Sequence, residues 1–198
     1  MTTRKHSHRI NSHLLEYITA MWRYKKITEY ISNECTILDV GCGFSGSLLF
    51  HVLDKIQTGY GLDISVNSNI NNEKIKLIEW DLHTDTFPQL PLFDIVTCLA
   101  VLEHVKDPAK LLRSIFNSLK NNGKLLLTVP SWKSKPVLEF LAFKLGALSK
   151  QEIADHKRYF NKEEIVNLCK EAGFLDIRHK YFQLGLNNFV LAKKYLFP

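Results

Sequence analysis

The chain has 198 residues, of which 45% are hydrophobic and 23% charged, with a formal net charge of +6 at pH 7. These values fit a globular domain with its own core and exclude a disordered or disulfide-stapled chain. The four cysteines form no C-x-x-C pair, which argues against structural zinc and for a reducing compartment, so we expect a cytoplasmic protein. The basic residues are spread along the chain, so the charge indicates either a basic surface or an anionic partner, and no nucleic-acid arm.

The sequence predicts neither a secretory signal nor a membrane-spanning segment. Residues 1–10 read as a frayed polar tail without the apolar run of a secretory signal. The most apolar stretch, residues 136–148, is interrupted by Glu139 and Lys144 and is too short to span a bilayer. We therefore expect one domain over residues 1–198.

The first two thirds of the chain predict alternating helices and strands. Apolar residues at helical spacing open the chain, and short apolar runs that end in glycine, aspartate or proline follow. This alternation is typical of a doubly wound, mostly parallel α/β sheet with helices on both faces. The expected helices cover residues 14–31, 47–55 and 107–121, and the expected strands cover 36–40, 58–63, 76–80, 93–100 and 124–129.

The last third predicts a different pattern. A helix over residues 161–172 is indicated by Asn161 as N-cap, with Glu164 three residues later completing a capping box. Two strands follow, over residues 175–182 and 189–195, and their connection is rich in glycine and asparagine. We therefore expect a C-terminal antiparallel hairpin.

A glycine motif follows the first predicted strand. The chain reads Gly41-Cys-Gly43-Phe-Ser-Gly46, and Asp63 ends the second strand 22 residues after Gly41 (63 − 41). Glycines let a ligand approach the backbone, and an acid at this distance can accept hydrogen bonds from ribose hydroxyls. The pattern is that of a dinucleotide site, so a nicotinamide dehydrogenase is one interpretation.

Three features favour a cationic ligand instead. Asp39 lies two residues before Gly41, where its carboxylate would repel a diphosphate and attract a cation. A further acid, Asp81, follows the third strand and could accept a hydrogen bond from an adenine amine, although aspartate is also common in turns. As a third feature, we expect no separate substrate domain. S-adenosylmethionine, with its sulfonium, ammonium, ribose and adenine, fits this set of groups.

Residues 34–130 resemble the class I S-adenosylmethionine-dependent methyltransferases. The resemblance implies S-adenosylmethionine as cofactor, S-adenosylhomocysteine as product, and a seven-stranded sheet with one antiparallel strand in the final hairpin. The matching motifs are Leu38-Asp39-Val40-Gly41-Cys42-Gly43, Gly61-Leu62-Asp63-Ile64, Asp81-Leu82, Phe93-Asp94-Ile95-Val96, Leu102-Glu103-His104-Val105 and Asn122-Gly123.

The resemblance also implies a set of cofactor-binding residues, with the backbone around Leu99 contacting the methionine part. Many relatives have a polar residue where this chain has Ala100, so no side-chain role is expected there. The expected cofactor-binding residues are Asp39, Gly41, Cys42, Gly43, Asp63, Ile64, Asp81, Leu82 and Leu99.

The catalytic residues are predicted less directly. His104 is either a proton acceptor or a surface histidine near a helix start, and His156 is the second candidate base because an ordinary histidine titrates near neutral pH. Residues 131–160 interrupt the alternation after the fifth strand and are expected to form a lid, with residues 137–148 roofing the acceptor. Lys157 or Arg158 could hold an anionic acceptor. No carboxylate cluster suggests a metal.

The class of acceptor remains open at this point. Residues 155–160 loosely resemble the small-molecule branch of the family, which methylates quinone-like compounds or acts in sugar and polysaccharide pathways, although they could simply be a polar loop. Methylation of RNA or protein is an alternative, but the base-methylating motif is missing: the chain reads Cys98-Leu-Ala-Val-Leu-Glu103 after strand four. A non-catalytic cofactor-binding partner subunit is a third hypothesis. A monomer and a homodimer are equally compatible with the sequence.

Overall fold

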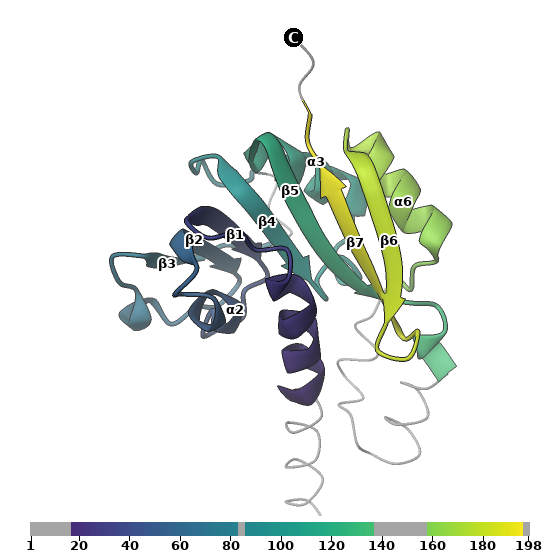
Figure 1. The fold of residues 1–198 in the computed structure, drawn as a ribbon, viewed down its shortest axis with the longest axis horizontal. Coiled ribbons are helices and arrows are strands. Elements are labelled where there is room, and N and C mark those ends of the chain that lie inside the picture. The colour runs from purple at the N-terminus through teal and green to yellow at the C-terminus, as the bar shows by residue number, and fades with distance from the viewer. Residues whose placement is uncertain (1–16, 83–85, 137–157, 196–198) are drawn as a thin grey trace, which may run out of the picture.

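The computed structural model describes residues 17–82, 86–136 and 158–195. Its centre is a seven-stranded sheet with the strand order β3-β2-β1-β4-β5-β7-β6 (Figure 1). All neighbouring pairs from β3 to β5 are parallel, whereas β7 runs antiparallel to both β5 and β6. The predicted doubly wound sheet with a C-terminal antiparallel hairpin is confirmed.

The strands lie close to their predicted positions. Each buried strand is an apolar run, as expected for a sheet covered on both faces. The strands are β1 (Cys35–Val40), β2 (Ile56–Asp63), β3 (Ile75–Glu79), β4 (Phe93–Leu99), β5 (Leu119–Pro130), β6 (Leu175–Phe182) and β7 (Asn187–Lys193).

Helices cover both faces of this sheet, and two separate apolar cores result. On one face, α3 (Pro108–Ser118) and α6 (Lys162–Glu171) pack on alternate residues of the strands. On the other face lie the helix over residues 17–28 and the short helix α2 (Ser47–His51), with the 3₁₀ turn η1 (Ser68–Ile70) at the edge. The helix over residues 17–28 stands at the carboxyl ends of the central strands (Figure 1).

Two boundaries differ most from the prediction. Helix α2 ends at His51, and the chain then turns through residues 52–55 before β2 begins at Ile56. Strand β5 begins at Leu119, so Asn122 and Gly123 lie within its bounds rather than ending a helix. The backbone N–H of Asn122 donates to the Lys194 carbonyl, so pairing beyond the end of β7 extends this region.

The predicted cap of α6 is confirmed. The Asn161 side chain accepts the Glu164 backbone N–H, and the Glu164 carboxylate accepts the Asn161 N–H, each at 2.9 Å. This reciprocal pair satisfies two backbone donors that a helix start otherwise leaves open. Within the described ranges, no helix is long and apolar enough to cross a membrane.

Candidate cofactor site

A cavity of about 280 Å³ lies at the carboxyl ends of β1 and β4. Open α/β sheets bind ligands at this edge, because the loops there can form a crevice. The cavity brings together five of the nine residues predicted to bind the cofactor: Asp39, Gly41, Cys42, Gly43 and Leu99. It is therefore the candidate site.

Asp39 is the most unusual group in the cavity wall. Its side chain is only 3% exposed, and the Thr97 hydroxyl donates a hydrogen bond of 2.6 Å to its Oδ1. Burial raises the pKa of Asp39 to about 7, and the nearby charge of Asp63 adds to this rise while the Thr97 bond opposes it. A carboxylate held in this way is stabilised by a cation that enters the cavity.

The first two glycines of the glycine loop have different functions. Gly41 has φ +77°, and a Cβ there would lie 2.2 Å from the Val101 side chain. Gly43 has φ +70°, and a Cβ there would meet no heavy atom of the described residues within 4 Å. Gly41 therefore permits close packing against the loop after β4, whereas the space above Gly43 is open to a ligand. The sequence interpretation assigned ligand approach to both glycines, and for Gly41 packing is the observed reason.

Asp63 does not line the cavity but is bound to its glycine loop. The Gly43 backbone N–H donates to Asp63 Oδ2 at 2.8 Å, which joins the carboxyl ends of β1 and β2. Beside this bond, Ile64 and Phe44 are each 61% exposed. Large apolar side chains at such exposure form a surface on which a flat ring such as adenine can pack. Phe44 was not among the predicted residues.

The helix over residues 17–28 supplies the part of the site that the sequence did not predict. Its Ala20, Arg23 and Tyr24 line the cavity opposite the glycine loop. The Tyr24 hydroxyl shares a hydrogen bond with Ser47, and Ser47 in turn lies 2.7 Å from the Ser45 hydroxyl. These hydroxyls and the guanidinium form a polar side that suits a carboxylate. The spacing i, i+3, i+4 places the three helix residues on one face of the helix. A face that packs on the core has the same spacing, so the spacing alone does not indicate a site.

The loop after β4 completes the wall. Ala100 lines the cavity with φ +57°, a left-handed conformation that a residue with a Cβ rarely adopts. Its backbone N–H donates to the Thr128 carbonyl at 2.9 Å. This bond orients the backbone between Leu99 and Val101 at the cavity.

The remaining predicted residues lie elsewhere or outside the described chain. Asp81 and Leu82 follow β3, and neither lines the cavity; Leu82 packs against the core on the α3 face. His104 is half-buried in the turn after β4, where its N–H donates to the Val101 carbonyl, and it does not line the cavity either. His156 lies outside the described residues, as do residues 137–157 in general.

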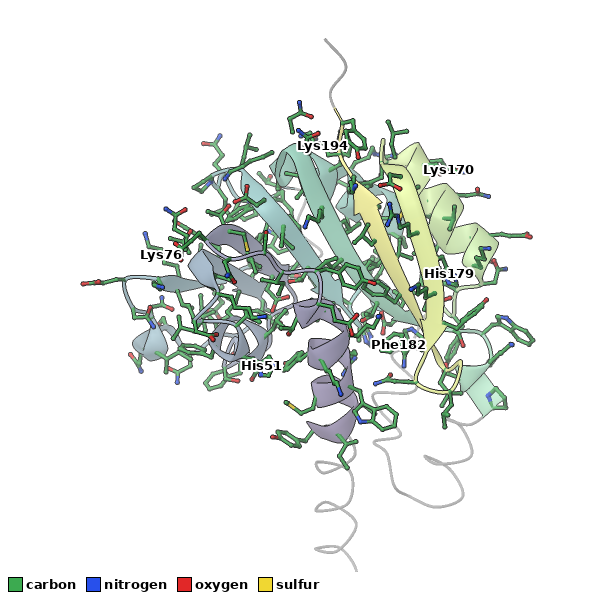
Figure 2. The ribbon with its side chains drawn as sticks, viewed as in Figure 1. His51, Lys76, Lys170, His179, Phe182 and Lys194 are labelled. Carbon is green, nitrogen blue, oxygen red and sulfur yellow. The ribbon has the colours of Figure 1, made fainter. Side chains whose placement is uncertain are left out.

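The two ends of the predicted lid meet at the carboxyl edge of the sheet. Ser131 and Phe160 form a parallel bridge, and the Phe160 N–H donates to the Pro130 carbonyl at 3.3 Å. The buried Asn188 amide donates to the carbonyls of Val129, Pro130 and Phe160. Residues 131–160 thus leave and rejoin the fold at one point on this edge, near the end of β6, where Phe182 is labelled in Figure 2.

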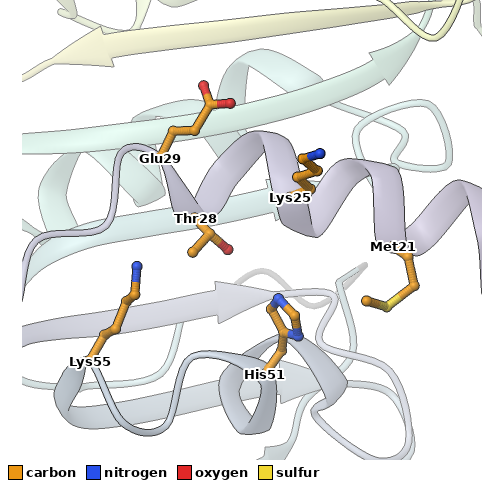
Figure 3. Close-up of a pocket in the computed structure, with 6 residues that line it drawn as sticks. All are labelled: Met21, Lys25, Thr28, Glu29, His51 and Lys55. Carbon is orange, nitrogen blue, oxygen red and sulfur yellow. The ribbon is translucent and has the colours of Figure 1, made fainter.

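A second hollow of about 480 Å³ lies between the helix over residues 17–28 and residues 51–55 (Figure 3). His51 and Lys55 point toward the helix over residues 17–28. Met21 points from that helix toward the side on which His51 lies. The ring centroid of Tyr24, which lines the cavity, lies 5.6 Å from that of His51, which lines this hollow. It contains none of the predicted cofactor-binding residues.

Comparisons with known proteins identify the family of this fold. The family described as methyltransferase domain matches residues 7–179. A ubiquinone biosynthesis O-methyltransferase of Neisseria meningitidis serogroup C is 26% identical over 174 residues, covering 80% of this chain and 70% of the relative. The protein of the same name in Hydrogenovibrio crunogenus is 28% identical over 179 residues, covering 84% and 69%.

A solved structure agrees in fold. The S-adenosylmethionine-dependent methyltransferase of Mesorhizobium loti superposes with a TM-score of 0.64 at 17% identity, covering 83% of this chain and 93% of that chain. At this identity the likeness concerns the fold alone.

Proposed function

This chain belongs to the S-adenosylmethionine-dependent methyltransferases, and we propose that it methylates a hydroxyl group of a small quinone-like or phenolic acceptor. One observation carries the assignment of the site: the buried Asp39, the open space above Gly43 and the guanidinium of Arg23 all border one cavity at the carboxyl edge of the sheet. The choice of acceptor is supported by the names of the two bacterial relatives.

The residues present fit the cofactor. Asp39 would attract its positive charge, and Arg23 with the hydroxyls of Tyr24 and Ser47 would bind its carboxylate. Asp63 keeps oxygen lone pairs beyond the one that accepts from Gly43, and these would accept from the ribose hydroxyls. The cavity of about 280 Å³ would enclose the methionine part and leave the adenine near Phe44 and Ile64, with Asp81 and Leu82 beside it.

The reaction requires positioning more than activation. The bound cofactor supplies an activated methyl group, because its sulfonium leaves as a neutral thioether. The protein's part is to align the acceptor atom with that methyl group and to exclude water. A hydroxyl acceptor also needs a base, and His104 and His156 remain our candidates.

We place the acceptor under residues 131–160. The support is that both ends of this segment are held at the carboxyl edge by Asn188, next to the loops that form the cavity. Lys157 or Arg158 would then favour an anionic acceptor. Residues 1–198 would act as one catalytic domain.

Binding and turnover test this proposal separately. Titration calorimetry of the full chain should show binding of S-adenosylhomocysteine and none of NAD. Incubation with S-adenosylmethionine and a panel of catechols, dihydroxybenzoates and sugars should then methylate a member of the phenolic set, detected by mass spectrometry. Binding of NAD without S-adenosylhomocysteine would contradict the cofactor site, and methylation of sugars alone would contradict the acceptor class.

The two candidate bases can be compared directly in the same assay. His156→Ala should lower turnover while S-adenosylhomocysteine affinity stays unchanged, and His104→Ala serves as the matched variant. Loss of turnover in His104→Ala alone would transfer the role to the loop after β4. Full activity in both variants would show that the acceptor needs neither histidine.

A further inference from the structure

Glu103 is a buried acid that the proposed reaction does not use. It lies in the turn after β4, three residues beyond the cavity residue Ala100, and is 1% exposed. Its Oε2 has no hydrogen-bond partner among the described residues. Buried polar atoms are normally paired, and an unpaired carboxylate oxygen is costly, so this position calls for an explanation.

The charged group that interacts with Glu103 belongs to the cofactor cavity. Attraction to the Arg23 guanidinium opposes the effect of burial on Glu103, and Glu103 in turn acts on Arg23 in the same way. Arg23 comes from the helix over residues 17–28 and lines the cavity. Glu103 therefore interacts electrostatically with a cavity residue that would bind the cofactor's carboxylate.

The other titratable groups that interact with Glu103, or with its neighbour Cys98, supply no positive charge. The Cys98 thiol on β4 interacts with Glu103, and burial raises its pKa well above the usual value, so it stays neutral. Asp39 on β1 and Cys169 on α6 interact with Cys98 in turn, and the buried Cys169 thiol is also neutral, with a pKa raised to about 12. A hydrogen bond to the backbone of Glu103 opposes the effect of burial on its pKa most, and the opposite charge of Arg23 comes second.

We propose that Glu103 is a positioning residue that acts through Arg23: its neutral carboxyl leaves the guanidinium available to the cofactor's carboxylate, and its carboxylate competes for that guanidinium. The proposal rests on the proposed cofactor site. In the competing state the unpaired Oε2 accepts from Arg23, and the cofactor's carboxylate meets a compensated charge.

The direction of the effect follows from the protonation of Glu103. Burial raises the pKa of Glu103 to about 8, so the carboxyl is mostly neutral at pH 7 and mostly ionised at pH 9. Cofactor affinity should therefore fall as pH rises through this range. One linked proton limits the fall to roughly tenfold per pH unit.

Titration calorimetry with S-adenosylhomocysteine between pH 7 and pH 9 tests the proposal on the full chain. Ionisation of Glu103 should contribute a roughly three- to tenfold rise to the wild-type Kd over this range, because it links a single proton to binding. In Glu103→Gln and in Arg23→Gln the rise should shrink to what the ligand's own amino group contributes, since each variant removes one member of the pair. Glu171→Gln, an exposed acid at the end of α6, is the matched control and should keep the wild-type rise.

The amino group of the ligand titrates equally in every variant, so only differences between variants count. A wild-type rise no larger than the rise in Glu103→Gln or in Arg23→Gln would overturn the proposal. If Glu103→Gln does not fold, Arg23→Gln alone decides. Absence of binding at every pH would instead refute the cofactor site itself.

Discussion

The two ends of the central sheet hold the same type of residue in opposite states. Asp94 stands at the amino end of β4, where it accepts from the Thr36 N–H, the Thr36 hydroxyl and the Lys120 ammonium at 2.7–2.9 Å. These partners hold the pKa of Asp94 below its usual value despite the effect of partial burial. Asp39, at the carboxyl end of the adjacent β1, accepts from Thr97 and has its pKa raised to about 7.

The difference between the two acids shows that the amino edge of the sheet is closed, whereas its carboxyl edge is open to a ligand. At the amino edge, basic side chains satisfy the strand ends: the Lys194 ammonium donates to the Leu119 carbonyl at 2.7 Å, and Figure 2 shows Lys194 at the edge opposite Phe182. At the carboxyl edge, Asp39 borders a cavity. Asp94, whose partners are complete, stabilises the fold. Asp39, which lacks a cation among the described residues, is available to bind a cationic group of a ligand.

The largest expected effect concerns the glycines at the open edge. Gly41→Val should lower the free energy of unfolding by about 3 kcal/mol or more, because the side chain would collide with Val101 and strain the backbone. Gly43→Ala should cost only about 1–2 kcal/mol of stability, from its positive φ, yet reduce S-adenosylhomocysteine binding. Chemical denaturation and calorimetry measure the two effects, and a Gly41→Val variant of wild-type stability would contradict the packing role.

The next prediction exchanges the two acids for amides. Asp39→Asn should weaken S-adenosylhomocysteine binding by about 1.5–3 kcal/mol, roughly 10- to 150-fold, because the attraction to a cation is lost. Asp94→Asn should leave affinity unchanged and lower stability by about 1 kcal/mol, since Asp94 is partly exposed. If both variants lost affinity equally, the distinction between the edges would not hold.

The same two variants should respond to pH with opposite signs. Folded Asp39 keeps its proton up to about pH 7, whereas in the unfolded chain it ionises near pH 4, so its burial destabilises the fold increasingly between these values. Asp39→Asn should therefore raise the Tm at pH 8 and not at pH 4, by roughly 2–4 °C for each kcal/mol.

Asp94 should show the reverse. Its lowered pKa contributes stability above about pH 4 that is lost as the pH falls through the folded value. The Tm of Asp94→Asn should be below that of the wild type at pH 8, and the two should converge toward pH 3. Differential scanning calorimetry across the range checks both signs, and parallel shifts of the two variants would disprove the assignment.

The smallest effect is expected at Ala100. Ala100→Gly should raise the free energy of unfolding by about 0.5 kcal/mol, because relief of the left-handed strain slightly exceeds the entropy cost of glycine. Asn122, also at positive φ but toward the amino edge, is the comparison site for the same change. Destabilisation by Ala100→Gly would show that the alanine methyl group contributes to packing at the cavity.

Much of the site was predictable because its residues belong to local patterns. Gly41 and Gly43 follow a short apolar strand, and Asp63 ends the next, so spacing alone places them at one edge. Arg23 and Tyr24 belong to a helix, and its periodicity predicts only whether a residue faces the core or the surface. Nothing in their own segment indicates that they face a glycine loop nearly twenty positions later.

The sequence by itself determined the alternation of strands and helices, the hairpin and the acids at the strand ends, because these depend on periodicity and on spacing within short segments. Only the tertiary structure decided which acid is buried without a cation, that Gly41 packs on Val101, and that the charges of Glu103 and Arg23 interact. Burial and charge interactions arise between segments that are distant in the chain. Their strength depends on the solvent that folding removes, which no local pattern records.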